Sequence, residues 1–156
     1  MSSAQHSKPV RLAQTALLAA VDGKWRAVER ALQRLNAECP GPGLGDALVA
    51  WCDALAEHSE GGPPEFGRVR VATLDADTGA MNAPGGQTPQ IQWCTRLVAA
   101  RAAGDREAFV ACMEELNAIQ DGHERGRYVV QLVESIALVV RRLPRGYARL
   151  GRTREA

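Results

Sequence analysis

Aromatic residues are scarce in this sequence: they make up 4% of its 156 residues, whereas hydrophobic residues as a whole make up 46%. A core must therefore be built mainly from Ala, Leu and Val. A chain of this length is the size of one domain, and it can bury such a core without disulfides or a structural metal. We expect residues 1–156 to form a single domain.

Clustered cysteines are also lacking, and no Cys-x-x-Cys pair is present among Cys39, Cys52, Cys94 and Cys112. Isolated cysteines in apolar helical stripes usually behave as small buried hydrophobes in a reducing compartment. The wide spacing does not fit the ligand pattern of a zinc site. We expect neither a metal nor a cofactor.

Long apolar runs are absent, since no segment approaches the ~18 residues of a membrane span. Residues 12–21 follow Lys8 and Arg11 and so weakly imitate a signal peptide, but polar side chains interrupt them. Lysine is rare as well: Lys8 and Lys24 are the two lysines among nineteen basic residues. Many arginines and alanines are typical of high-GC codon usage, so we expect a bacterial, cytoplasmic protein with no membrane contact.

Positive charge is concentrated at the C-terminus. Residues 141–156 hold six arginines and one acid, a net of +5, whereas residues 1–140 hold 13 bases and 17 acids, a net of −4. Such a basic tail attracts phosphates, and an aromatic residue within it can stack on a base. A solvated end or a protein contact is the alternative interpretation. The candidate partner-binding residues of the tail are Arg141, Arg142, Arg145, Tyr147 and Arg149.

An internal duplication organises the rest of the chain. A shift of 81 residues aligns residues 23–58 with the segment that begins at Gly104, without a gap. The triplet Leu-Asn-Ala recurs at residues 35–37 and 116–118. Identities are few, but the helix signals and the apolar periodicity also repeat in phase.

Each half begins with a helix-capping hydroxyl, Ser7 or Thr88, followed closely by a proline. Glycines are placed to end the first helices in the left-handed conformation. Asp22 and Asp105 are placed to cap the second helices, because a carboxylate there meets free backbone N–H groups.

Apolar residues recur at i, i+3, i+4 and i+7 in the later helices of each half, the pattern of a helix packed on a core. The second helices carry Val28, Ala31, Leu32 and Leu35, and in phase Phe109, Cys112, Met113 and Leu116. The third helices carry Leu48, Trp51, Cys52 and Leu55, and in phase Val129, Leu132, Val133 and Ile136.

We predict an all-α fold: a six-helix bundle built from two tandem three-helix repeats, residues 7–58 and 88–143. Short connections favour antiparallel neighbours, and two units are too few for an open solenoid. Residues 144–156 form the basic tail.

The insertion between the repeats, residues 59–87, is rich in Gly and Pro, and its middle alternates like a half-exposed strand. We predict that it forms a short β-hairpin. It contains Asp77-Thr78-Gly79-Ala80, the tetrapeptide that carries the catalytic aspartate of retroviral-type aspartic proteases. That chemistry needs a second aspartate and a β-rich domain, so a turn is the favoured interpretation. Asp75 and Asp77 lack the remaining ligands of a calcium loop. Both stay candidates for binding because the insertion is unduplicated.

The remaining residues offer little reactive chemistry. The histidines, His6, His58 and His123, are not spaced with Ser or Cys as a recognisable nucleophile pair. Trp25, at the start of a helix, is a candidate interface anchor, since Trp is over-represented in interfaces. We therefore expect a non-enzymatic interaction or regulatory module that acts through protein–protein contacts, including self-association. The alternative is a small nucleic-acid-binding regulator that uses the Arg-rich tail.

Overall fold

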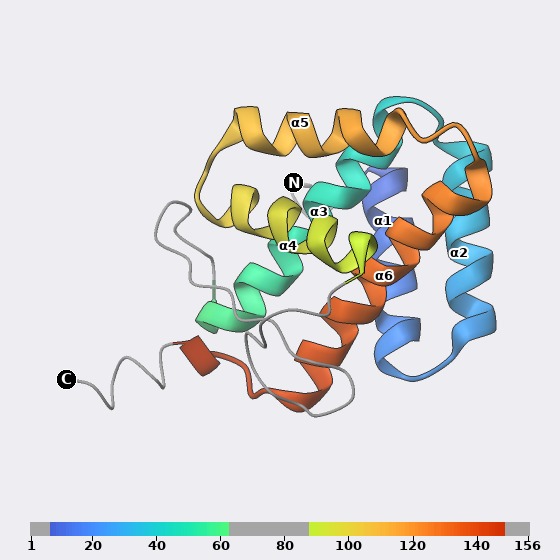
Figure 1. The fold of residues 1–156 in the computed structure, drawn as a ribbon. Coiled ribbons are helices and arrows are strands. Elements are labelled where there is room, and N and C mark those ends of the chain that lie inside the picture. Colours follow the sequence, from blue (N-terminus) through green and yellow to red (C-terminus); the bar gives the residue numbers. More distant parts are fainter. Residues whose placement is uncertain (1–6, 63–87, 149–156) are drawn as a thin grey trace.

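The computed structural model describes residues 7–62 and 88–148. These residues form six α-helices and no strand, which confirms the predicted all-α fold (Figure 1). The helices are α1 (Lys8–Val21), α2 (Trp25–Glu38), α3 (Pro42–Glu60), α4 (Pro89–Ala102), α5 (Arg106–Asn117) and α6 (Gly122–Arg142).

The six helices form two antiparallel hairpins and two long helices (Figure 1). One hairpin is α1 with α2, and the other is α4 with α5. The long helices α3 and α6 contact each other and run diagonally between the hairpins. Each long helix also contacts both α1 and α4, so these two first helices lie at the centre of the packing.

The two halves are closely similar in the positions of their helices. Helices α4, α5 and α6 begin 81, 81 and 80 residues after α1, α2 and α3. Exchanging each helix with its counterpart also reproduces the set of helix pairs in contact within the described residues. The weakest of these contacts are α2 with α3 and α5 with α6. Consecutive neighbours in the chain are therefore not always neighbours in the packing.

The predicted apolar stripes form part of the core, which also includes buried residues of α1 and α4. In α2 and α5 the first, second and fourth residues of each stripe are buried, while the third, Leu32 or Met113, is half-buried. In α3 and α6 all four residues of each stripe are buried. Periodicity therefore predicted correctly which face of α2, α3, α5 and α6 is turned inward.

Two buried tryptophans connect neighbouring helices through hydrogen bonds. The Trp51 indole N–H donates to the carbonyl oxygen of Ala13 in α1 at 2.8 Å. The Trp93 indole N–H donates to the carbonyl oxygen of Cys112 in α5 at 2.9 Å. A buried indole N–H without such a partner would lower the stability of the folded protein. The indoles thus fix helix spacing as well as fill the core.

Side-chain caps open the second half. The Thr88 hydroxyl accepts a hydrogen bond from the backbone N–H of Ile91 at 3.2 Å. The Asp105 carboxylate accepts one from the N–H of Ala108 at 3.0 Å, at the start of α5. Both predictions are confirmed, and each cap satisfies a backbone donor that the helix leaves free.

The first half lacks equivalent caps. Ser7 occupies the N-cap of α1 but its side chain makes no capping hydrogen bond. The prediction for Asp22 was wrong, because Asp22 is the C-cap of α1 and Lys24 occupies the N-cap of α2. The intervening Gly23 has a φ of 74° and ends α1 in the left-handed conformation, as predicted.

The helix ends differ at one place from the segment boundaries expected from the sequence. Helix α3 continues to Glu60, two residues into the segment predicted as an insertion. Helix α6 ends at Arg142, next to the predicted boundary at residue 143. Residues 63–87, which contain the predicted hairpin, lie outside the described residues.

We expect urea denaturation to distinguish the caps of α4 and α5 from the uncapped start of α1. Thr88→Ala and Asp105→Ala should each lower the free energy of unfolding by about 1 kcal/mol, because each leaves a helix N–H without its acceptor. Ser7→Ala is the matched control and should change it by no more than about 0.5 kcal/mol. Equal losses for Ser7→Ala and Thr88→Ala would contradict this assignment of caps.

Candidate functional site

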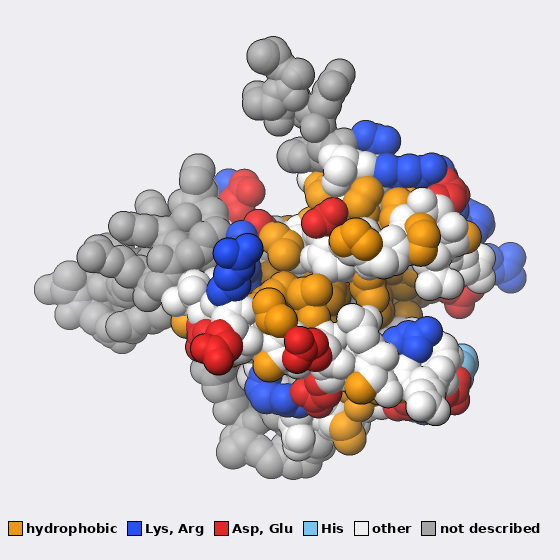
Figure 2. Space-filling view, turned by 90° about the horizontal axis from the view of Figure 1, so that it is seen from above, with side chains coloured by type: hydrophobic (Ala, Val, Ile, Leu, Met, Phe, Trp, Pro, Cys, Tyr) orange, Lys and Arg blue, Asp and Glu red, His pale blue; other side chains and the backbone are white. Residues whose placement is uncertain are grey.

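A groove lies between the first half of α3 and the turn that joins α4 to α5, with a volume of about 560 Å³. We call it the α3–α5 groove. Seen from the side of α5, hydrophobic side chains gather in the middle of this face, bordered by acidic and basic ones (Figure 2). The groove is lined by Pro42, Gly45, Asp46, Val49, Ala100, Arg101, Gly104, Asp105, Arg106, Phe109, Val110 and Met113.

The lining of the α3–α5 groove is mainly apolar. Val110 is 43% exposed and presents an aliphatic side chain at the surface of α5. Met113 reaches across from α5 so closely that a Cβ at Gly45 would lie 2.9 Å from its methyl carbon. Gly45 therefore makes room for a flexible thioether that adapts to different shapes. An apolar surface of this kind favours a hydrophobic ligand or a partner side chain.

The charged residues of the groove divide into two pairs. Arg101 and Asp105 already have structural roles. Arg101 donates to both carboxylate oxygens of Asp53 in α3, at 2.7 and 3.1 Å, and this bond raises the pKa of Arg101. Asp105 caps α5. Asp46 and Arg106 are exposed and form no ion pair within the part of the chain described here.

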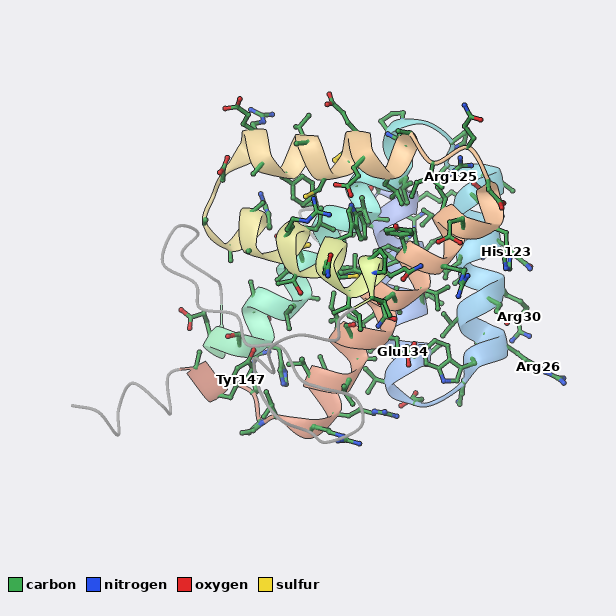
Figure 3. All side chains as sticks on the ribbon, in the orientation of Figure 1. Arg26, Arg30, His123, Arg125, Glu134 and Tyr147 are labelled. Carbon is green, nitrogen blue, oxygen red and sulfur yellow. The ribbon has the colours of Figure 1, made fainter. Side chains whose placement is uncertain are left out.

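Trp25, a predicted interface anchor, is the first residue of α2 and is 40% exposed. Both of its chain neighbours, Lys24 and Arg26, are exposed cations. Figure 3 shows Arg26 and Arg30 projecting from the outer side of α2, away from the body of the protein. The structure therefore places an exposed indole beside a row of basic side chains.

The candidate residues of the tail lie in different environments. Arg141 and Arg142 form the last turn of α6 and are exposed. Arg145 makes an ion pair with Glu57 of α3 at 3.1 Å. Three further candidates, Arg149, Asp75 and Asp77, lie outside the described residues.

Tyr147 packs against the end of α3. Its ring centroid lies 6.2 Å from that of His58, at a tilt of 50°. The side chain is half-buried, and its hydroxyl is enclosed without a hydrogen-bond partner among the described residues. Figure 3 shows Tyr147 near the end of the described chain, beyond α6. This ring is therefore not free to stack on a base in the arrangement described.

His58, near the end of α3, forms hydrogen bonds with the residues that follow α6. Its ring Nε2 lies 2.8 Å from the Leu143 carbonyl oxygen, and since a carbonyl only accepts, Nε2 donates. The backbone N–H of Gly146 donates to the His58 carbonyl oxygen at 2.7 Å. The sequence indicated only a histidine near a helix end and contained no signal for this partner.

Two glycines meet at the same place, with Gly61 at φ 79° and Gly146 at φ 80°. A Cβ on Gly61 would lie 3.1 Å from the Gly146 Cα, closer than most side-chain carbons approach another atom. We call residues 57–61 and 143–147 the C-terminal junction. It holds the first residues after α6 on the end of α3.

The described residues contain no group of three or more His, Cys, Asp or Glu side chains positioned to hold a metal ion. Over the same residues, no helix combines the length and apolar character that crossing a membrane requires. The cysteines are free thiols, of which Cys52, Cys94 and Cys112 are buried and Cys39 is half-buried. Burial raises the pKa of the Cys94 thiol to about 12 and raises the pKa values of Cys52 and Cys112 as well.

Of the lining residues, sequence reasoning missed Val110 as a surface residue. The available signal was its position, one residue after Phe109 and so outside the apolar stripe of α5. An aliphatic residue outside the stripe is expected to face solvent or a partner.

We expect one reactive thiol in the native protein. Cys39 should react with Ellman's reagent, whereas the buried thiols stay protonated and inaccessible, because their raised pKa values leave little thiolate at neutral pH. Cys39→Ser should remove the fast phase, and urea should expose the remaining thiols. Rapid reaction of a second thiol in the folded protein would contradict the burial described.

Compared with protein-family models, with curated proteins and with solved structures, the chain has no significant match. Its function must therefore be inferred from its own surfaces, above all the α3–α5 groove and the C-terminal junction.

Proposed function

We propose that this chain is a non-enzymatic helical module that binds a protein partner in the α3–α5 groove and acts through that contact. The observation that carries the proposal is the open groove itself, with Val110 exposed beside a half-buried Met113. Grooves of this kind between helices accept the apolar face of a partner helix or a single large side chain.

The charges around the groove are suited to binding a partner. Two of its four charged residues already have partners within the fold. Arg101 is held by both oxygens of Asp53, and Asp105 by the first turn of α5. Asp46 and Arg106 are exposed and stand on the two sides of the groove, where charged residues commonly set the orientation of a partner.

A tandem duplication is part of the same proposal. The offset of the helix starts, which varies by only one residue, the shared pattern of helix contacts and the matched burial of the stripes support two related repeats, residues 7–58 and 88–143. The second repeat supplies α5 to the groove and the first supplies α3. A partner in the groove would therefore contact both repeats at once.

We propose nucleic-acid binding by the tail as the second function. Arg141 and Arg142 favour it, because they are exposed at the end of α6 and make no ion pair within the described residues. Arg145 and Tyr147 weigh against it, because Glu57 and His58 already engage them. The groove is therefore the better-supported site. A bacterial, cytoplasmic origin remains our expectation from composition.

Val110→Glu tests the groove. Copurification of the tagged protein from its own cells should recover a partner with the native chain and about tenfold less with this variant, as expected for a loss of about 1.4 kcal/mol in binding. Ala111→Glu is the matched control, since Ala111 is an exposed neighbour on α5 that does not line the groove. Equal recovery with both variants would exclude the groove as the binding surface.

The nucleic-acid proposal predicts a steep salt dependence. Binding to unrelated DNA or RNA, measured by fluorescence anisotropy, should weaken by about 0.9 log units per phosphate contact for each tenfold rise in salt. It should disappear on truncation after Leu143 and weaken in the double variant Arg141→Gln, Arg142→Gln. Failure of the full chain to bind at low salt would rule this function out.

A further inference from the structure

Trp25 is an exposed aromatic side chain without an evident role in the fold. It lies at the first position of α2, is 40% exposed and is not among the residues that form or border the core. Its indole N–H has no hydrogen-bond partner among the described residues, unlike those of Trp51 and Trp93. An indole on the surface is a frequent anchor of protein interfaces, where it is buried in a pocket of the partner.

Cations outnumber acids near Trp25 in the sequence, where the acids are Asp22 and Glu29. Lys24 and Arg26 flank it in sequence, and Arg30 follows Arg26 by one helical turn. None of these three cations forms an ion pair within the described residues, and Figure 3 shows Arg26 and Arg30 turned outward together. Glu29 is the one acid between them on the helix. A surface with this composition fits an apolar pocket with carboxylates at its edge.

The α3–α5 groove has that composition in part, because its four charged residues are two aspartates and two arginines, of which Arg101 is already paired with Asp53. Its apolar lining includes Val49, Val110 and Met113, and two carboxylates, Asp46 and Asp105, stand at its edge. Its volume of about 560 Å³ lies within the range of pockets that enclose a small ligand, and is ample for one indole.

Arg106 is the remaining cation of the groove that no carboxylate neutralises within the described residues, since Arg101 is bound to Asp53. A guanidinium beside an indole ring is attracted to the ring face. Arg106 is therefore compatible with an aromatic occupant, although it would repel Lys24 or Arg26 if they came close.

We infer that the α3–α5 groove receives Trp25 of a second copy of this chain. The inference rests on the proposed function, because it names the partner of the same groove. Trp25 supplies the apolar anchor, and Lys24 and Arg26 face Asp46 and Asp105 at the edge.

Trp25 does not reach the α3–α5 groove of its own molecule. The first residue of α2 lies at the end of the α1–α2 hairpin remote from α5, and α5 forms the opposite edge of the protein (Figure 1). The two surfaces are also different from each other, so the contact is heterologous. Repeated heterologous contacts extend into a chain or close into a ring, rather than stopping at a symmetric dimer.

The contact is small, because it centres on one side chain. Stable interfaces bury more than about 1,000 Å² in total, so self-association is expected to be weak and to increase with protein concentration. Opposite charges at the edge make it sensitive to salt.

Sedimentation velocity over a range of protein concentrations tests the inference. The weight-average mass of the native chain should rise with concentration beyond that of a dimer, and added salt should reduce it. Trp25→Ala and Val110→Glu should each abolish the rise, since each removes one of the two complementary surfaces. Gln33→Ala on α2 and Ala111→Glu on α5 are matched controls and should associate like the native chain, and circular dichroism confirms that all variants keep their helices.

An equimolar mixture of Trp25→Ala and Val110→Glu is the decisive sample. The first variant keeps an intact groove and the second keeps Trp25, so the mixture should form one-to-one dimers and nothing larger. A native chain that stays monomeric at every concentration, or a Trp25→Ala variant that associates normally, would overturn the inference.

The outcome separates this inference from the proposed function. If the native chain is monomeric while Val110→Glu still loses a copurified partner, the groove binds another protein and self-docking is wrong. If Val110→Glu changes neither association nor copurification, both the inference and the proposed function fail.

Discussion

Close packing of α1 and α4 against both long helices is the constraint on which the fold depends. Ala13, Ala16 and Ala20 of α1 have side chains that are almost completely buried. Small side chains let helix axes approach, so three helices surround α1. In α4 the residue 81 positions after Ala20 is Arg101, which binds Asp53 at the surface and lines the α3–α5 groove. The groove therefore opens beside a position where one half has a small residue and the other has a charged one.

The apolar stripes could be predicted because periodicity alone determines which face of a helix is buried. The groove could not be predicted, because its existence depends on the spacing between α3 and α5, which are not adjacent in the chain.

Asp22 shows that the sequence does not determine which residue occupies an N-cap. Several polar residues near a helix end can occupy the N-cap position. Which of them does so depends on the residue at which the backbone leaves the helical conformation. At α2 the N-cap position is occupied by Lys24, whose side chain makes no capping hydrogen bond.

The environments of the tail residues also could not be predicted from the sequence. Composition identified a cluster of cations and one aromatic ring, but it contained no information about their partners. His58 and Glu57 lie far from Tyr147 and Arg145 in sequence, and only the packing of α3 against α6 brings them together. Charge clusters therefore predict an electrostatic surface, whereas the availability of each side chain depends on tertiary contacts. In this protein Arg145 and Tyr147 of the cluster form contacts within the C-terminal junction.

The contact between Gly61 and Gly146 has a consequence for evolution. A side chain on Gly61 would press on the Gly146 Cα at 3.1 Å, and both residues have a positive φ that other residues rarely adopt. A lineage that keeps the junction is therefore expected to keep both glycines, and one that loses it is free to lose both. Covariation of two such distant positions in an alignment of homologues would mark those in which the end of α6 still returns to α3.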